Sequence, residues 1–244
     1  MCIRDRCVWI GGGIWLNTQR PEWNDANNAL AGWGCSLVTL FHLYRYLQFV
    51  GQLYEAQEDI QYLVSQEVAD WCNDVENALT SCGKINDPAA QFNSMDALGR
   101  AASRYRANLY AQGIQKEPVP IEASSLAEFC SLACKIIRPT LQQAIEEDHL
   151  AHSYTILHLA SECSIKIEAL PLMLEGQIAA LASGILSSTD ALALLNALRR
   201  SPLYSTRQGS YLLYADENLP TFSARNHIAP NLSLIHISEP TRPY

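Results

Sequence analysis

Apolar residues recur at three- and four-residue steps through much of the chain, and this repeat limits the folds available to it. In the clearest stretch, Leu37, Leu40, Phe41 and Tyr44 follow directly after Ser36, a residue suited to cap a helix. Residues spaced in this way share one face of an α-helix, and that face becomes buried against a neighbour. The pattern therefore predicts an amphipathic helix that begins just after Ser36.

Five further segments carry the same repeat. Asp87 and Pro88 are placed to cap and open one of these helices, Gly113 to end it, and Pro139 is expected to kink or break another. The six expected helices begin near residues 36, 58, 88, 124, 171 and 190. A succession of long amphipathic helices with short links favours an all-α fold of stacked helical hairpins.

Three segments depart from the helical repeat. Residues 7–33 are rich in Gly, Asn and Trp and are expected to form a loop, with a short strand near residues 8–10. Residues 149–168 are ambiguous, because residues 164–168 alternate as a short strand does. Residues 204–214 are rich in Tyr and Ser and are expected to be extended.

Charge and cysteine content bear on the partners and the compartment. The net charge of −8 leaves no basic stripe to meet phosphates, so neither nucleic acid nor an anionic membrane is expected as a partner. No apolar run has the roughly 18–20 residues that a membrane-spanning helix needs. The eight cysteines are scattered and form no C-x-x-C pair, which predicts no metal site and favours the reducing cytoplasm. No cofactor-binding motif is recognised.

The segment from Thr18 to Asn28 concentrates the side chains that carbohydrate sites use. Its eleven residues include two carboxylates, one arginine, one tryptophan and three asparagines. Carboxylates serve as general acids or bases, Asn and Arg fix hydroxyl positions, and an aromatic ring packs on the apolar face of a sugar. The alternative is a capping loop, because Asp and Asn are also favourable residues at a helix N-terminus.

Residues 23–32 resemble the W-N-D-x-x-N-x-x-x-G segment of cellobiose-phosphorylase-like enzymes. Those enzymes belong to the six-hairpin glycosidase superfamily, which is built as an (α/α)6 barrel. The resemblance implies that this chain forms part of an (α/α)6 toroid, and that Asp25 is the general acid that protonates the leaving glycosidic oxygen. Glu22 matches the acidic residue often found just before the tryptophan. Ala26 and Asn27 depart from the Gly-Met that usually follows the aspartate.

A second cluster, Glu175-Gly176-Gln177, opens another apolar helix. Glu175 is a candidate second carboxylate, and Gln177 is a candidate hydroxyl ligand. Alternatively, Gly176 allows close helix packing while Glu175 is solvated or pairs with an arginine. The candidate catalytic residues are thus Asp25, Glu22 and Glu175, and the candidate substrate-binding residues are Arg20, Trp23, Asn24, Asn28 and Gln177.

The sequence predicts a piece of an enzyme that cleaves glycosidic bonds in an oligosaccharide or a polysaccharide-derived substrate. Hydrolysis is favoured over phosphorolysis, because no basic cluster that could hold phosphate lies beside the motif. A non-catalytic helical scaffold or interaction module is the alternative. Both termini resemble translated sequencing-adapter read-through, so residues 7–231 are expected to form the partial catalytic domain, and residues 1–6 and 232–244 to be non-native.

Overall fold

The computed structural model describes residues 8–15, 33–57, 59–114, 117–145, 147–161, 164–215 and 220–225. Over these residues the protein is mixed α/β, so the prediction of an all-α fold of stacked helical hairpins in a partial (α/α)6 toroid is wrong. The error has a physical cause. Helical repeats are visible within one short segment, whereas a sheet is held together by pairings between segments that lie far apart in the chain.

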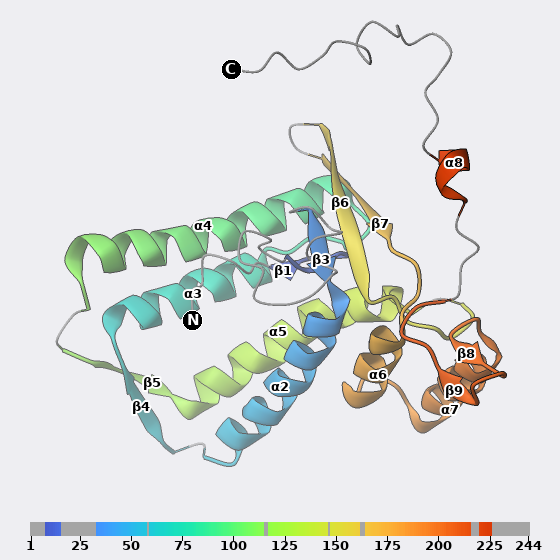
Figure 1. Ribbon diagram of the computed structural model, residues 1–244. Helices are drawn as coiled ribbons and strands as arrows, with labels where there is room; N and C mark the ends of the chain where they lie inside the picture. The colour runs from blue at the N-terminus through green and yellow to red at the C-terminus, as the bar shows by residue number, and fades with distance from the viewer. Residues whose placement is uncertain are drawn as a thin grey trace, which may run out of the picture.

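A five-stranded antiparallel sheet stands at one end of the molecule (Figure 1). Its central pairing joins Cys35 to Thr155, which are 120 positions apart, so no local pattern could reveal it. In spatial order the strands are β1 (Val8–Trp9), β2 (Gly13–Trp15), β3 (Gly34–Ser36), β6 (Tyr154–Ser161) and β7 (Ser164–Ala169). The strands expected near residues 8–10 and 164–168 are therefore confirmed. The ambiguous segment, residues 149–168, contains both β6 and β7.

The helices form two packed pairs: α2 against α5, and α3 against α4 (Figure 1). The short helix α6 packs against α2, and α7 follows it. The helices of the described residues are α2 (Leu37–Glu55), α3 (Gln66–Thr80), α4 (Pro88–Gln112), α5 (Ala123–Gln143), α6 (Leu174–Ala182), α7 (Ser188–Arg200) and α8 (Phe222–Arg225).

Two short antiparallel ribbons complete the described fold. β4 (Gln61–Val64) pairs with β5 (Val119–Glu122), and β8 (Tyr204–Ser205) pairs with β9 (Ser210–Tyr211). The expectation of an extended segment near residues 204–214 is confirmed. The helix expected from about residue 58 begins only at Gln66. Residues 61–64 instead alternate in exposure along β4.

The predicted helix starts are confirmed at the two helices where a side chain was expected to cap the first turn. Ser36 Oγ accepts a hydrogen bond from the Thr39 amide at 3.0 Å and caps α2. Asp87 Oδ1 accepts one from the Ala89 amide at 3.0 Å, and Pro88 occupies the first turn of α4. α5 continues through Pro139 without ending there, so the expected break is not present.

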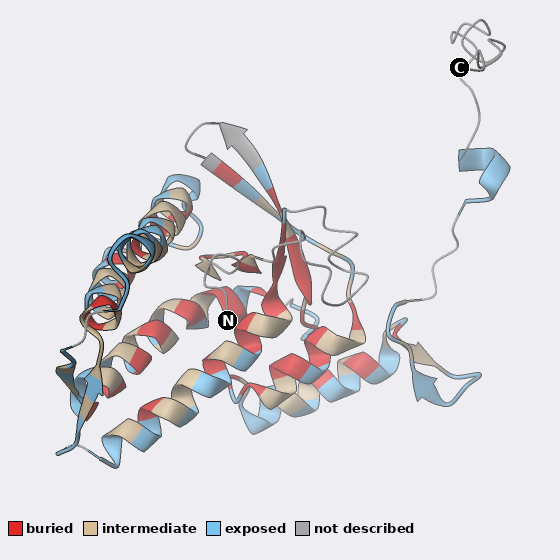
Figure 2. Ribbon diagram, turned by 60° about the vertical axis from the view of Figure 1, so that its left-hand side comes forward, coloured by how far each residue is buried: buried red, intermediate tan, exposed pale blue. Residues whose placement is uncertain are grey.

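The principal core lies where α2, α5 and α6 meet the sheet. Figure 2 shows the buried residues gathered along the inward sides of these elements, while their outward sides are exposed. The fully buried side chains of α2 include Leu37, Leu40 and Phe41, as the sequence repeat predicted. Across the described residues, no helix has both the length and the apolar character needed to cross a membrane.

Candidate functional site

The motif that resembles a glycosidase segment falls outside the described residues. Residues 16–32 join the end of β2 at Trp15 to Trp33, directly before β3. The chain is well anchored on either side, because Ile14 and Cys35 are both buried. The predicted site residues in this segment, whose roles therefore stay predictions, are Arg20, Glu22, Trp23, Asn24, Asp25 and Asn28.

The other two predicted site residues lie on α6. Glu175 is half-buried in the first turn of the helix, where a carboxylate interacts favourably with the helix dipole. Gln177 is fully buried, and its amide is bonded to the backbone on both sides. Its Oε1 accepts from the Ala151 amide at 2.8 Å, while its Nε2 donates to the carbonyls of Ala151 at 2.6 Å and Met173 at 3.0 Å. These bonds tie α6 to the segment that leads into β6.

Gly176 permits this close approach of α6 to the sheet. A Cβ atom at position 176 would lie 2.6 Å from Ser153 Oγ and 2.8 Å from the Ala151 carbonyl oxygen. The Gly176 amide uses the same proximity to donate to Ser153 Oγ at 2.9 Å. The close-packing interpretation of this glycine is therefore confirmed.

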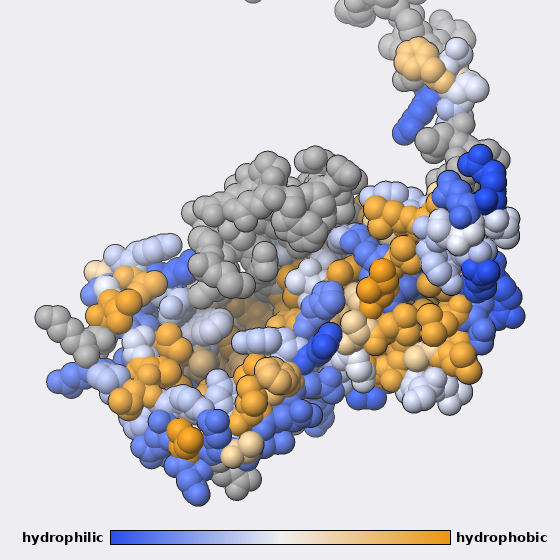
Figure 3. Space-filling view, turned by 60° about the horizontal axis from the view of Figure 1, so that its bottom comes forward, coloured by the Kyte–Doolittle hydropathy of each residue, from blue (hydrophilic) through white to orange (hydrophobic). Residues whose placement is uncertain are grey.

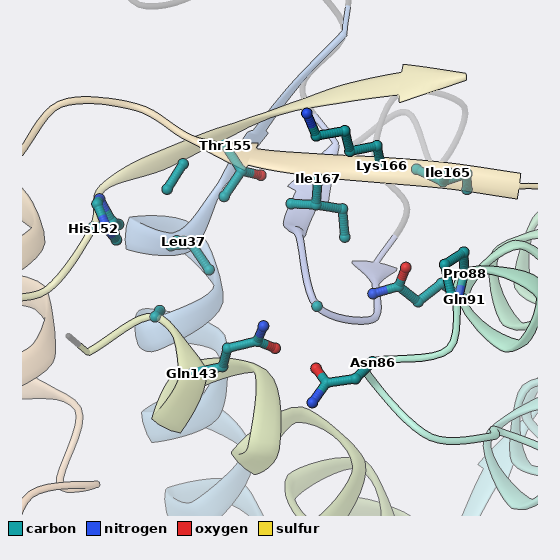
Figure 4. A pocket seen from close by; sticks show the side chains of 13 residues that line it. Leu37, Asn86, Pro88, Gln91, Gln143, His152, Thr155, Ile165, Lys166 and Ile167 are labelled. Atoms are coloured by element: carbon teal, nitrogen blue, oxygen red, sulfur yellow. The ribbon is translucent and has the colours of Figure 1, made fainter. Parts of the chain in front are cut away.

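A cavity of about 410 Å³ opens between β7 and the ends of two helices. One wall is formed by β7 and its neighbour β6, and the opposite wall by the start of α4 and the end of α5 (Figure 4). The turn between β1 and β2 closes one side. The lining residues are Gly11, Leu37, Asn86, Pro88, Gln91, Gln143, Ala144, His152, Thr155, Ile165, Lys166, Ile167 and Ala169.

Three side-chain amides converge on this cavity from three different elements. Figure 4 shows Asn86, from the turn before α4, Gln91, from α4, and Gln143, from the end of α5, all directed toward the space beside β7. Asn86 and Gln143 are exposed and have no hydrogen-bond partner among the described residues. Gln91 is buried, and its Nε2 donates to the Ile85 carbonyl. The two exposed amides therefore keep their donors and acceptors for water or a ligand.

The glycine turn lies close against the Gln91 side chain. Gly11 has a φ of +84°, a conformation that favours glycine, and a Cβ atom there would lie 2.5 Å from Gln91 Nε2. The Gly11 amide donates to Thr140 Oγ1 on α5 at 2.9 Å. Gly13 has a φ of +120°, and a Cβ atom there would lie 2.9 Å from the backbone of Ser36. The glycine run thus brings β1, α4 and α5 together at the edge of the cavity.

The cavity wall carries little charge. None of its described lining residues has a carboxylate, and Lys166 is the one Lys or Arg among them. His152 Nδ1 lies 2.9 Å from the Leu170 carbonyl oxygen, which fixes the imidazole orientation. Thr155 Oγ1 donates to the Gly12 carbonyl at 2.7 Å. The available polar groups are therefore mainly neutral amides beside an apolar strand.

Sequence reasoning did not identify these three amides. Their convergence depends on the pairing of β6 with β3 and on the packing of α4 beside β7. The sequence held one signal for the buried amide. The polar Gln91 stands directly before Phe92, the first apolar residue of the stripe along α4. A polar residue buried at such a position needs a specific partner, here the Ile85 carbonyl.

No protein-family model matches the chain, and no curated protein is similar to it. Within the part of the chain that the structure describes, no group of three or more His, Cys, Asp or Glu side chains is arranged to hold a metal ion.

Proposed function

We propose that the chain is part of a carbohydrate-active enzyme, which holds a neutral sugar in the amide-lined cavity and cleaves a glycosidic bond with Asp25 as the general acid. The observation that carries the proposal is the convergence of Asn86, Gln91 and Gln143 on one cavity. Its volume of about 410 Å³ falls within the range of roughly 300–1,000 Å³ typical of small-molecule sites.

The chemistry of the lining fits a sugar. A side-chain amide both donates and accepts, as a hydroxyl group does, so Asn and Gln can bind hydroxyls in either sense. The apolar side chain of Ile167 gives the C–H face of a pyranose ring a surface to pack on. Lys166 is the one Lys or Arg among the described lining residues, whereas the three amides that converge on the cavity are neutral. A neutral polyhydroxylated ligand is therefore favoured.

The catalytic part of the proposal rests on the sequence. Asp25 lies in a segment that is joined at both ends to the same sheet that supplies β6 and β7 to the cavity. In the proposed hydrolysis its carboxylic acid donates a proton to the glycosidic oxygen as the bond from that oxygen to the sugar carbon breaks. A water molecule adds to the sugar carbon and loses a proton to solvent, and solvent returns a proton to the Asp25 carboxylate. Trp33, which follows the segment and is 49% exposed, offers an aromatic surface for a further sugar unit.

Sugar binding is tested by calorimetric titration of the chain with neutral oligosaccharides of different linkages. Asn86→Ala and Gln143→Ala should each weaken binding roughly 3- to 10-fold, the value of one lost neutral hydrogen bond. Gln142→Ala is the matched control, since Gln142 is exposed on the same helix but does not line the cavity. Equal affinities for all four proteins would show that the sugar does not occupy this cavity.

Cleavage is tested separately by measuring the turnover of bound oligosaccharides. Asp25→Asn should lower turnover by orders of magnitude without changing the fold, because an amide has nearly the same size as a carboxyl group but cannot donate the required proton. Unchanged turnover in Asp25→Asn would remove Asp25 from the mechanism.

A non-catalytic sugar-binding module is the second candidate function. The observation in its favour is that no carboxylate lines the described cavity, and that Glu175 lies outside it. Binding that depends on Asn86 and Gln143, with no cleavage by the wild-type chain, would select this second function.

A further inference from the structure

A groove with a volume of about 260 Å³ runs between helices α2 and α5 and shares no lining residue with the amide-lined cavity. On the face of the molecule that Figure 3 shows, apolar side chains form several separate patches with hydrophilic side chains between them. The groove is likewise mixed in character, and two of its lining residues, Cys130 and Cys134, carry thiols. Its other lining residues are Leu47, Gln48, Gly51, Gln52, Glu55, Ala127 and Ser131.

Both thiols are directed from α5 toward α2. Cys134 Sγ donates to the Tyr44 carbonyl oxygen at 3.9 Å. A Cβ atom at position 51 of α2 would lie 3.3 Å from Cys130 Cβ, so the absence of a side chain at Gly51 leaves space beside this thiol. Burial, followed by the charge of Cys130, raises the pKa of the Cys134 thiol to about 11, which shows that the two thiols lie within electrostatic reach of each other.

The spacing of the two cysteines suits a bridging ion better than a disulfide. Cys130 and Cys134 are four residues apart on α5, and the Cβ atoms of such a pair are about 5–6 Å apart in a helix. A disulfide needs Cβ atoms about 3.5–4.5 Å apart. Two metal–sulfur bonds of about 2.3 Å each allow the sulfur atoms to lie up to roughly 4.6 Å apart. An ion can therefore bridge the two thiols without unwinding the helix.

The number and kind of ligands identify the ion. Thiolates select soft ions, of which copper(I), zinc and the iron of iron–sulfur clusters are the common examples. Structural zinc sites and iron–sulfur clusters take four protein ligands, whereas no group of three or more His, Cys, Asp or Glu side chains is arranged for a metal among the described residues. Copper(I) is a closed-shell ion that two thiolates satisfy in a linear arrangement. We propose that Cys130 and Cys134 bind one copper(I) ion in this groove.

The binding step replaces two S–H bonds with two copper–sulfur bonds, releases two protons to solvent and transfers no electron. Both protons are present at neutral pH, because burial raises the pKa of each thiol. The product carries one negative charge. Gln48 and Gln52 line the groove, and their side-chain amides make no hydrogen bond to the described residues. Their N–H groups can therefore donate to the thiolate sulfur atoms.

Anaerobic titration of the whole chain with copper(I), in competition with a coloured copper(I) chelator, tests the proposal. The wild-type chain should hold one ion and release two protons as it binds. Cys130→Ala and Cys134→Ala should each lower the affinity roughly 100-fold or more, because losing a ligand costs more than the roughly 10- to 100-fold cost of losing a residue that supports one.

Cys72→Ala is the matched control, because Cys72 is a half-buried thiol on α3 that does not line the groove. Its affinity for copper(I) should stay within a few-fold of wild type. A wild-type chain that loses all copper(I) to the chelator would overturn the proposal. Equal weakening by Cys72→Ala and Cys134→Ala would also overturn it, because the binding would then not depend on the groove.

X-ray absorption at the copper K-edge of the wild-type complex supplies an independent arm that needs no variant. The spectrum should show two sulfur neighbours and no nitrogen or oxygen neighbour. This result decides the question even where alanine at the buried position 130 prevents folding, which thermal melting in circular dichroism would reveal. Three or more sulfur neighbours, or a mixture of sulfur and nitrogen, would contradict a two-thiolate site.

Discussion

Replacing Gln177 with leucine separates a structural role for this residue from a binding one. Leucine keeps an apolar side chain of similar size in the fully buried site but removes all three hydrogen bonds of the amide. The Ala151 amide and carbonyl are then left without the Gln177 partner in a buried position. Each buried backbone group that loses its partner costs about 1–3 kcal/mol, and part of this is offset by burying an apolar side chain. The expected loss is therefore about 3 kcal/mol of unfolding free energy.

Thermal denaturation followed by circular dichroism measures this loss. For a chain of this length, about 3 kcal/mol corresponds to a Tm lowered by roughly 6–12 °C. Gln142→Leu is the matched control, because Gln142 is exposed on α5 and its replacement should change stability by no more than about 0.5 kcal/mol. A Gln177→Leu variant that melts like wild type but no longer binds sugar would refute the structural role. It would return Gln177 to the substrate-binding role that the sequence predicted.

Three further predictions follow from local geometry and burial. Gly176→Ala should destabilise the fold by about 1–3 kcal/mol, because its Cβ would lie 2.6 Å from a neighbouring hydroxyl, whereas Gly99→Ala in the open interior of α4 should stabilise it by about 0.5–1 kcal/mol. Ser36→Ala should lower the free energy of unfolding by about 0.5–2 kcal/mol, because it removes the cap of α2; urea denaturation measures this loss. Burial raises the pKa of the Cys134 thiol to about 11, above the ordinary value of about 8.5, so its alkylation rate should still be rising at pH 10.

The sign of the cysteine effect on stability follows from the same shift. A thiol with a raised pKa in the folded state keeps its proton more tightly there than in the unfolded chain. The stabilising contribution of Cys134 is therefore complete below about pH 8.5 and is lost as the pH rises toward about 11. Burial also raises the pKa values of Cys72, Cys82 and Cys130, which act in the same direction. Equal stability at pH 8 and pH 10 would contradict this reasoning. A Gly176→Ala variant as stable as Gly99→Ala would contradict the packing argument made for Gly176.

The parts of the fold that the sequence predicted correctly are those set by neighbouring residues. Ser36 and Asp87 accept hydrogen bonds from backbone amides two or three positions later, so their capping roles are visible in a short window. The buried face of α2 likewise follows from a repeat within one helix. Each of these features depends on contacts that the local sequence contains.

The parts that could not be predicted depend on pairings between distant segments. The β4 strand was mistaken for the start of a helix, because the apolar spacing of residues 60–64 fits both structures until β5 is known to lie beside it. The five-stranded sheet depends on the pairing of Cys35 with Thr155, which joins two remote segments. The cavity could not be predicted for the same reason, since the residues that line it come from segments far apart in the chain.

The proposal that the amide-lined cavity holds a neutral sugar is tested most directly by nuclear magnetic resonance of the side-chain amides. The chain, labelled with ¹⁵N at Asn and Gln, is titrated with neutral oligosaccharides, and variants assign the Asn86 and Gln143 signals. Both signals should shift with one common dissociation constant, while the signal of Gln142, on the same helix outside the cavity, should stay in place. A saturable sugar titration that leaves the Asn86 and Gln143 amides unmoved, or the absence of any titration across the oligosaccharides, would contradict the account.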